Sequence, residues 1–163
     1  MPTLKGGGRP GCLRLSELAS PMNTSCDQSA KRVTIARRLE GAGLRPTRQR
    51  VSLAALLFGS GDRHVNAEML HEEAVRSGVR VSLATVYNTL HQFVRAGLLR
   101  EIAIGGQRAY FDTNTSNHNH FFVEAEGRLV DIVGNEIRVD GLPEPPEHLK
   151  ISHIDVVVRL IAK

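Results

Sequence analysis

Histidine and aspartate side chains recur along this chain at spacings that suit metal binding. His118 and His120 are separated by one residue, and because residues i and i+2 of a β-strand point to the same side, both imidazoles can reach one ion. Asp112 precedes this pair, Asp131 lies on the next predicted strand, and His64 ends a loop before a predicted helix. Such a mixed nitrogen and oxygen set suits zinc, manganese or ferrous iron. Spacing alone favours two surface histidines over a metal site, so the prediction depends on the elements around them.

Signatures of other chemistry are absent from the sequence. There is no G-x-S-x-G, no glycine-rich phosphate-binding loop and no H-E-x-x-H, and His71 is not followed by a second histidine four residues on. The two cysteines, Cys12 and Cys26, do not form a CxxC pair, which argues against a cysteine-based zinc site or a disulfide scaffold. We therefore expect a protein that is not an enzyme.

Four helices are predicted between residue 30 and residue 97. Pro, Ser, Thr and Asn favour helix starts, and Gly favours helix ends. The first helix covers about residues 30–42. The predicted starts and ends of this helix and of the next three helices are marked by Gly43, Pro46, Thr47, Gly59, Asn66, Gly78, Ser82 and Gly97.

The fourth helix combines one apolar stripe with a polar surface suited to base contacts. Val86, Leu90, Phe93 and Val94 recur at i, i+4, i+7 and i+8 and predict the buried stripe. A helix of this kind fits the major groove of DNA, although an ordinary surface helix would share the pattern. The side chains on its other faces that can bond to base edges and phosphates are Thr85, Tyr87, Asn88, His91, Gln92 and Arg95.

A β-hairpin is predicted after the fourth helix. Two extended runs, residues 98–104 and 107–111, flank Gly105 and Gly106. Helices followed by such a hairpin are the plan of a winged helix-turn-helix, which lays its last helix in the major groove and its hairpin along the DNA backbone. We therefore predict an α+β fold with an N-terminal winged helix-turn-helix domain over residues 30–112, preceded by a flexible arm of 29 residues that is rich in Gly, Pro and Ser.

Residues 113–163 are predicted to form a small α/β dimerisation domain. Strands are expected over residues 121–123 and 128–133, joined at Gly127, and over residues 151–161. Three short strands bury little apolar surface alone. We therefore expect this unit to pair with a second copy and make a homodimer.

Positive charge is concentrated in the first part of the chain. Residues 1–112 carry 16 Lys+Arg against 9 Asp+Glu, whereas residues 113–163 carry 5 against 8. A basic part joined to an acidic part indicates that the first contacts a polyanion, although a modest positive balance also favours solubility alone. The residues predicted to contact DNA are Arg45, Arg48, Arg50, Ser82, Thr85, Tyr87 and Asn88.

The sequence shows no feature of a membrane or secreted protein. No apolar run approaches the roughly 18 residues needed to cross a bilayer. The basic N-terminus is not followed by the continuous apolar segment of a secretory signal. We expect no membrane association and a cytoplasmic location.

Several motifs occur together in the order found in the ferric uptake regulator (Fur) superfamily, which the chain resembles. They are residues 43–50 (GLRPTRQR), 64–70 (HVNAEML), 83–87 (LATVY), 96–98 (AGL) and 118–131. Within that superfamily the chain is most similar to the iron response regulators (Irr) of alphaproteobacteria. This resemblance implies a dimeric repressor or activator that binds an AT-rich inverted repeat when iron is scarce and is inactivated by haem.

The resemblance also implies roles for individual residues. Tyr87 matches the family's base-contacting tyrosine, and Arg45 matches its minor-groove basic residue. The family's regulatory site takes one divalent metal ion per subunit, zinc, manganese or iron. Its ligands correspond to His64, Asp112, His118, His120 and Asp131.

Some family positions differ in this chain. The usual His-His-Asp-His run is replaced by residues 117–120, which keep two histidines, and Arg138 stands where a glutamate ligand is expected. The family's second, inter-domain metal site is therefore not expected here. Residues 123–126 lack the CxxC of a structural zinc site, and neither cysteine is followed by proline as in a Cys-Pro haem motif. Haem, the expected effector, would therefore bind at His118 or His120.

Three functions stay open at this point. The first is a regulator of iron and haem homeostasis that leaves DNA when haem binds. The second is a metal-corepressed Fur-type repressor that uses iron, manganese or zinc. The third is a haem- or metal-binding protein without a DNA role. The response of DNA binding to salt, chelator and haem separates them.

Overall fold

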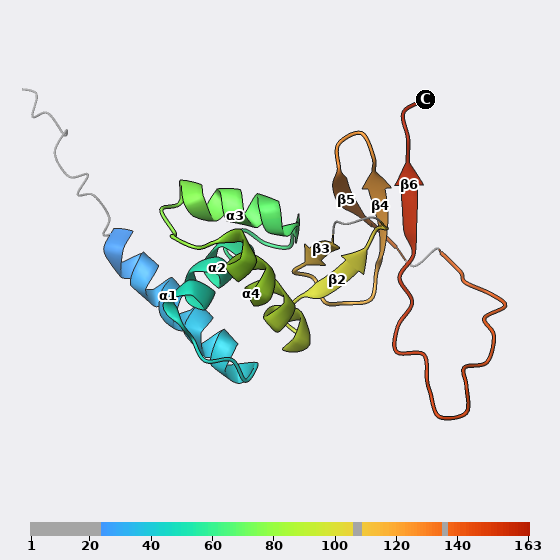
Figure 1. Ribbon diagram of the computed structural model, residues 1–163, viewed down its shortest axis with the longest axis horizontal. Coiled ribbons are helices and arrows are strands. Elements are labelled where there is room, and N and C mark those ends of the chain that lie inside the picture. The colour runs from blue at the N-terminus through green and yellow to red at the C-terminus, as the bar shows by residue number, and fades with distance from the viewer. Residues whose placement is uncertain (1–23, 106–108, 135–136) are drawn as a thin grey trace, which may run out of the picture.

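The computed structural model describes residues 24–105, 109–134 and 137–163 of the chain. Four helices form one body, and two three-stranded sheets lie beside it (Figure 1). The first sheet lies between the helices and the second sheet. This arrangement confirms the predicted α+β class.

Helix α1 spans Thr24–Gly41 and begins earlier than the sequence predicts. Residues 24–29, which are assigned above to the flexible arm, are helical because no proline or glycine interrupts the chain between residues 24 and 40. The rest of that arm, residues 1–23 with Cys12, lies outside the described residues.

The next three helices begin where their capping residues predict. Thr47, Asn66 and Ser82 each accept a hydrogen bond from the backbone N–H three residues on. At the end of the last helix, Gly97 has a φ of +70°, a left-handed conformation that glycine adopts without steric cost. These helices are α2 (Arg48–Phe58), α3 (Ala67–Arg76) and α4 (Leu83–Arg95).

The first sheet is antiparallel, with strand order β1-β3-β2. It consists of β1 (His64–Val65), β2 (Arg100–Ala103) and β3 (Ala109–Asp112). Strands β2 and β3 confirm the predicted hairpin, whose residues 106–108 lie outside the described part of the chain. The sequence does not predict β1, because two residues are too short to show an alternating pattern and only their pairing with β3 defines them as a strand.

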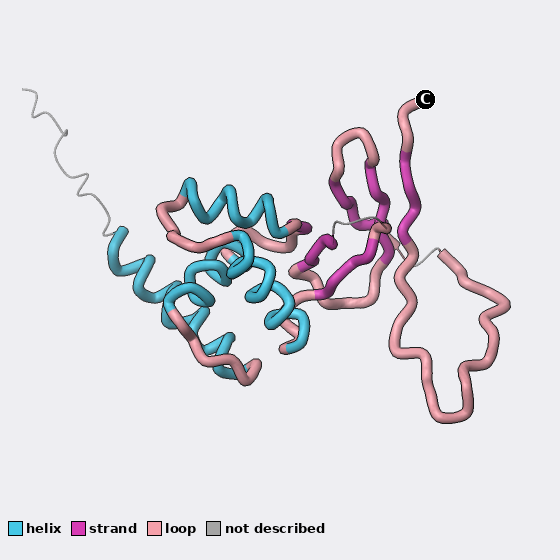
Figure 2. Tube along the Cα trace, in the orientation of Figure 1, coloured by secondary structure: helices cyan, strands magenta, loops and turns pink. Residues whose placement is uncertain are grey.

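The second sheet has the order β5-β4-β6, with β6 parallel to β4. Its strands are β4 (Asn119–Val123), β5 (Arg128–Ile132) and β6 (Val157–Leu160). The predicted strand over residues 151–161 is wrong in its first half, which has no regular structure (Figure 2). The reason is that β4 begins at Asn119, one residue before the pair of His120 with Val157, so it has no strand residues opposite residues 151–155.

Two hydrophobic cores lie on opposite faces of the first sheet. The helices pack around a large core that includes Phe93 and Phe111. A smaller core, which includes Ile102 and Tyr110, joins the first sheet to the second. Because side chains alternate along a strand, Phe111 faces the helices while Tyr110 and Asp112 face the second sheet. Strand β3 therefore contacts both parts of the molecule.

Candidate functional site

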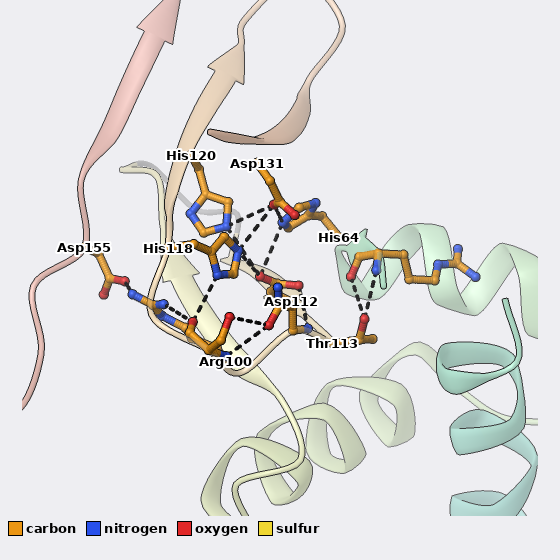
Figure 3. Close-up of polar contacts among 11 residues, drawn as sticks. His64, Arg100, Asp112, Thr113, His118, His120, Asp131 and Asp155 are labelled. Carbon is orange, nitrogen blue, oxygen red and sulfur yellow. Dashed lines mark hydrogen bonds and ion pairs between the residues drawn. The ribbon is translucent and has the colours of Figure 1, made fainter. Parts of the chain in front are cut away.

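Five side chains from both sheets converge on one point (Figure 3). They are the five predicted ligands, His64, Asp112, His118, His120 and Asp131, and one ligand atom from each lies within 4.8 Å of all the others. Two ligand atoms bound on opposite sides of a zinc ion would be about 4.2 Å apart. Small movements therefore suffice for all five atoms to contact a single ion.

Strand pairing positions four of these five residues. His64 lies opposite Asp112 in the register of β1 and β3, and His120 lies opposite Asp131 in the register of β4 and β5. His118 lies just before β4, and its ring centroid is 4.4 Å from that of His120. Each sheet thus contributes a His–Asp pair, and the two pairs meet where the sheets pack together.

The distances show that three imidazoles share two carboxylates. Nε2 of His64 lies 3.4 Å from Oδ2 of Asp112 and 3.0 Å from Oδ1 of Asp131. From Nε2 of His118 to the same two oxygens the distances are 3.0 and 3.3 Å. From Nε2 of His120 they are 3.4 and 3.6 Å. All three Nε2 atoms therefore surround one oxygen from each aspartate.

Most of these short contacts are not directed as hydrogen bonds. Nε2 of His64, Nε2 of His118 and Oδ1 of Asp131 are buried and have no hydrogen-bond partner. The contact between Nε2 of His120 and Oδ2 of Asp112, at 3.4 Å, does satisfy hydrogen-bond geometry. Buried polar atoms without partners are costly, so clusters of them need a physical reason. A cation between these lone pairs would satisfy them together, so the residues fit a metal ion.

Neighbouring groups orient two of the ligands. Nδ1 of His118 lies 3.0 Å from the carbonyl oxygen of Ser116 and can donate to it, which leaves Nε2 for a metal. The backbone N–H of Asn114 donates to Oδ1 of Asp112 at 2.8 Å, so Oδ2 is left to face the imidazoles. The predictions above do not include Asn114 and Ser116. The sequence feature that could have predicted their role is the Asp, Asn and Ser composition of the loop after β3, which favours such local side-chain hydrogen bonds.

Burial and close charges perturb the acid–base behaviour of the site. Burial lowers the pKa of His64, but the close contact with Asp112 and its negative charge, followed by those of Asp131, outweigh it, so the pKa is raised above its ordinary value. Burial raises the pKa of Asp112, but the hydrogen bond with His120, the close contact with His64 and the hydrogen bond from the Asn114 N–H hold this pKa well below its usual range. Asp112 is therefore ionised at neutral pH, as a metal ligand must be.

The residues predicted to contact DNA fall into three groups in the structure, of which the third, Tyr87 and Arg50, is described below. Arg45, Arg48 and Asn88 are exposed, and their side chains form no hydrogen bond or ion pair within the described part of the chain. Ser82 and Thr85 bond to each other at the start of α4, with their hydroxyl oxygens 2.9 Å apart. The first group is free to meet a ligand, whereas the second group also stabilises the helix.

Tyr87 and Arg50 hold α4 in place. The Tyr87 hydroxyl donates to Oε1 of Glu68 on α3 at 2.8 Å. Nε and Nη2 of Arg50 donate to Oε1 of Gln92 at 3.0 and 2.8 Å, and Nη1 donates to the carbonyl oxygen of Arg45 at 2.9 Å. Gln92, which the sequence places on the polar surface of α4, therefore joins this helix to α2. No local pattern indicates that contact, because its partners lie far apart in the sequence.

The fold and the site define a class of protein, a winged helix-turn-helix protein with a second unit that completes a metal-competent site. The ferric uptake regulator family model matches residues 41–158, and the chain belongs to this family. Its relatives are transcription regulators and not enzymes, which confirms that prediction. None of the helices in the described residues is long and apolar enough to cross a membrane.

Individual relatives support this assignment. The peroxide-responsive repressor PerR of Staphylococcus aureus is 34% identical over 93 residues, and the match spans 57% of this chain but only 62% of PerR. The crystal structure of the Vibrio cholerae ferric uptake regulator has a TM-score of 0.64 at 22% identity and covers 78% of this chain and 98% of that one. The regulator from Pseudomonas aeruginosa, solved with manganese, has a TM-score of 0.57 at 28% identity and covers 76% and 96%.

Proposed function

We propose that this protein is a DNA-binding transcription regulator whose affinity for its operator is set by one divalent metal ion per subunit. The observation that carries the proposal is the convergence of five ligand atoms, several of them buried without a hydrogen-bond partner. Zinc, manganese and iron all suit this set of three imidazoles and two carboxylates. The manganese in the P. aeruginosa relative supports a site of the same kind.

The position of the site explains how a bound ion would affect the DNA-binding surface. Strands β1 and β3 supply His64 and Asp112, and the second sheet region supplies the other three ligands. An ion held by all five would tie the two sheets together. The hairpin of β2 and β3 is the wing of this fold. Because Phe111 of β3 packs among the helices, a shift of β3 would move the wing relative to α4. The ion favours whichever arrangement of the domains it binds more tightly.

On DNA, we place α4 in the major groove with Asn88 toward the base edges. The half-buried ring of Tyr87 would contact bases beside it, while its hydroxyl stays on Glu68. Arg45 would enter the adjacent minor groove, whose negative potential is strongest in AT-rich DNA. Arg50 would act by positioning α4 rather than by contacting DNA, since Gln92 and the Arg45 carbonyl hold its guanidinium.

A homodimer would present two such helices to an inverted repeat. We propose that residues 113–163 form the dimerisation and sensing unit. Strand β6 lies at the edge of the second sheet, and its Val158 and Leu160 side chains are 36% and 40% exposed, with Ile161 beside them at 77%. An edge strand with exposed apolar side chains is a ready surface for pairing. We place the action of this dimer in the cytoplasm.

A second candidate is release from DNA by haem, in control of iron and haem homeostasis when iron is scarce. It is supported by the resemblance to iron response regulators and by a hollow of about 260 Å³ beside His118. Both polar side chains (Asn117, Asn119) and apolar ones (Ile137, Val139, Ile154, Val156) line this hollow. Haem ligation by His118 or His120 would dismantle the five-ligand set, because Nε2 of each faces Asp112. The two candidates therefore predict opposite effects on DNA binding.

The test is fluorescence anisotropy of a labelled AT-rich inverted repeat with the full chain in chelator, with added Mn²⁺, Fe²⁺ or Zn²⁺, and with stoichiometric haem. The site variant combines His118→Ala with His120→Ala. Its matched control is His153→Ala, because His153 is an exposed histidine outside the cluster.

Metal regulation predicts weak binding in chelator and tight binding with metal, lost in the site variant and kept in the control. Tight binding in chelator that collapses with haem supports the second candidate, provided that the site variant still binds DNA and ignores haem. Absence of DNA binding under every condition would overturn both and leave a haem- or metal-binding protein without a DNA role.

A further inference from the structure

A second concave surface lies within the helical body. It has a volume of about 670 Å³ and is lined by Arg32 of α1, by Arg48 and Gln49 at the start of α2, and by Ser77 and Arg80 of the turn between α3 and α4. Figure 1 shows that turn at the end of the helical body away from the sheets. We call this surface the arginine pocket.

The arginine pocket carries positive charge that the described residues do not balance. The side chains of Arg32, Arg48 and Arg80 are exposed and form no ion pair within the described ranges, and no acidic residue lines the pocket. Several other arginines form ion pairs, such as Arg63 with Glu73 at 2.8 Å. Three like charges around one hollow repel each other and favour an anion between them.

The backbone beside the pocket also favours an anion. Arg48 and Gln49 are the first residues of α2, and their N–H groups precede the first intrahelical hydrogen bond. Helices α2 and α4 have no acid in their first turns, whereas α3 has Glu68 there. The dipole of α2 is therefore left for an external negative charge.

We propose that the arginine pocket binds a phosphate group of the DNA backbone beside the bases contacted by α4, so that α1 joins the DNA-binding surface through Arg32. Guanidinium groups bind phosphate oxygens in a bidentate manner, which suits a hollow lined by three of them. The pocket ends two residues before Ser82, the N-cap of α4, so it lies next to the helix that would enter the groove. This inference rests on the proposed DNA-binding function.

The experiment is the salt dependence of anisotropy for the full chain on the inverted repeat and on a scrambled duplex. The pocket variants are Arg32→Gln, Arg48→Gln and Arg80→Gln, singly and combined. The matched control is Arg37→Gln, an exposed arginine on α1 outside the pocket. Each single variant should weaken binding to both duplexes alike, and the triple variant should reduce the slope of log K against log salt by roughly one, because one phosphate contact is lost. The control should leave the slope unchanged.

Two results separate failure of this inference from failure of the proposed function. If the wild-type protein binds DNA and the triple variant shows the same slope of log K against log salt, the phosphate contact of the arginine pocket alone is overturned. Wild-type protein that binds no DNA would overturn the proposed function and the inference together. Calorimetry with sodium pyrophosphate tests the other source of phosphate. If the triple variant loses pyrophosphate binding and yet keeps its DNA affinity, that result would assign the pocket to a free phosphorylated ligand and reject the DNA contact.

Discussion

The two aspartates of the five-ligand site differ in how far they are built into the fold. Asp112 is fully buried and holds hydrogen bonds, whereas the side chain of Asp131 is 40% exposed and its Oδ1 has no hydrogen-bond partner. Replacement of Asp112 would leave its hydrogen-bond donors without a partner in the interior, so it would disturb folding as well as metal binding. Asp131 is therefore the proposed ligand whose replacement separates metal binding from folding.

Asp131→Asn should lower the affinity for Mn²⁺ or Zn²⁺ by at least about tenfold, because a neutral amide replaces an anionic ligand in a partly buried site. Competition against a chromogenic chelator measures that affinity. Asp140→Asn, at an exposed position outside the cluster, should leave the affinity unchanged. An Asp131→Asn protein with wild-type affinity would show that Asp131 is not a ligand.

Tyr87 combines two roles that substitution can separate. Tyr87→Phe removes the hydrogen bond to Glu68 but keeps the ring, so the free energy of unfolding should fall by about 1 kcal/mol while affinity for the operator is kept. Tyr87→Ala removes the ring as well and should weaken specific DNA binding by about 1–3 kcal/mol. Thermal unfolding and anisotropy on the same samples measure both quantities. Loss of operator affinity in Tyr87→Phe would instead place the hydroxyl on DNA.

Among the elements, α4 depends on polar contacts as well as on its apolar stripe. Val86, Leu90 and Phe93 are fully buried as predicted, and the buried Thr89 beside them bonds to the backbone of its own helix. The pair formed by Arg50 and Gln92 then sets the position of α4 relative to α2. In the proposed complex, the angle at which α4 would meet DNA therefore depends on a contact that is not itself with DNA.

A double-mutant cycle of Arg50→Ala and Gln92→Ala should give a coupling energy of about 0.5–3 kcal/mol in unfolding, since the two side chains share two hydrogen bonds. Denaturant titration measures each free energy. The matched cycle of Arg48→Ala with Gln92→Ala should be additive, because Arg48 forms no hydrogen bond or ion pair with Gln92. If the free energies in the first cycle are additive, Arg50 does not position α4 through Gln92.

For the whole molecule, the proposed metal site lies where the two sheets pack together. The same region contains the smaller core and the ion pair of Arg100 on β2 with Asp155. Arg159 on β6 also donates a hydrogen bond to the carbonyl oxygen of Ile104, which follows β2. An ion in this region would stabilise a large part of the fold at once.

Addition of Mn²⁺ or Zn²⁺ at about 100 times its dissociation constant should raise the free energy of unfolding by about 2.7 kcal/mol. For a chain of this size that corresponds to an increase in Tm of roughly 5–11 °C. Differential scanning calorimetry measures the increase, and Asp131→Asn should show little of it at the same metal concentration. An equal increase in that variant would locate the stabilising ion elsewhere.

Local interactions along the chain made most of the secondary structure of this protein predictable from its sequence. Helix caps such as Thr47 and Ser82, and the glycines that end helices, act over three or four residues, so the helices and the hairpin could be predicted. The start of α1 and the length of β6 could not, because a helix extends until something interrupts it and a strand lasts only as long as its partner.

The types and order of the five metal-ligand candidates are present in the sequence, whereas their convergence is a property of the tertiary structure. His64 meets Asp112 through the two-residue strand β1, and the resulting pair meets His120 and Asp131 only because two sheets pack across a shared core. The same holds for the arginine pocket and for the contact of Arg50 with Gln92. Long-range packing decides such contacts, because no short-range propensity encodes which distant side chains share one point in space.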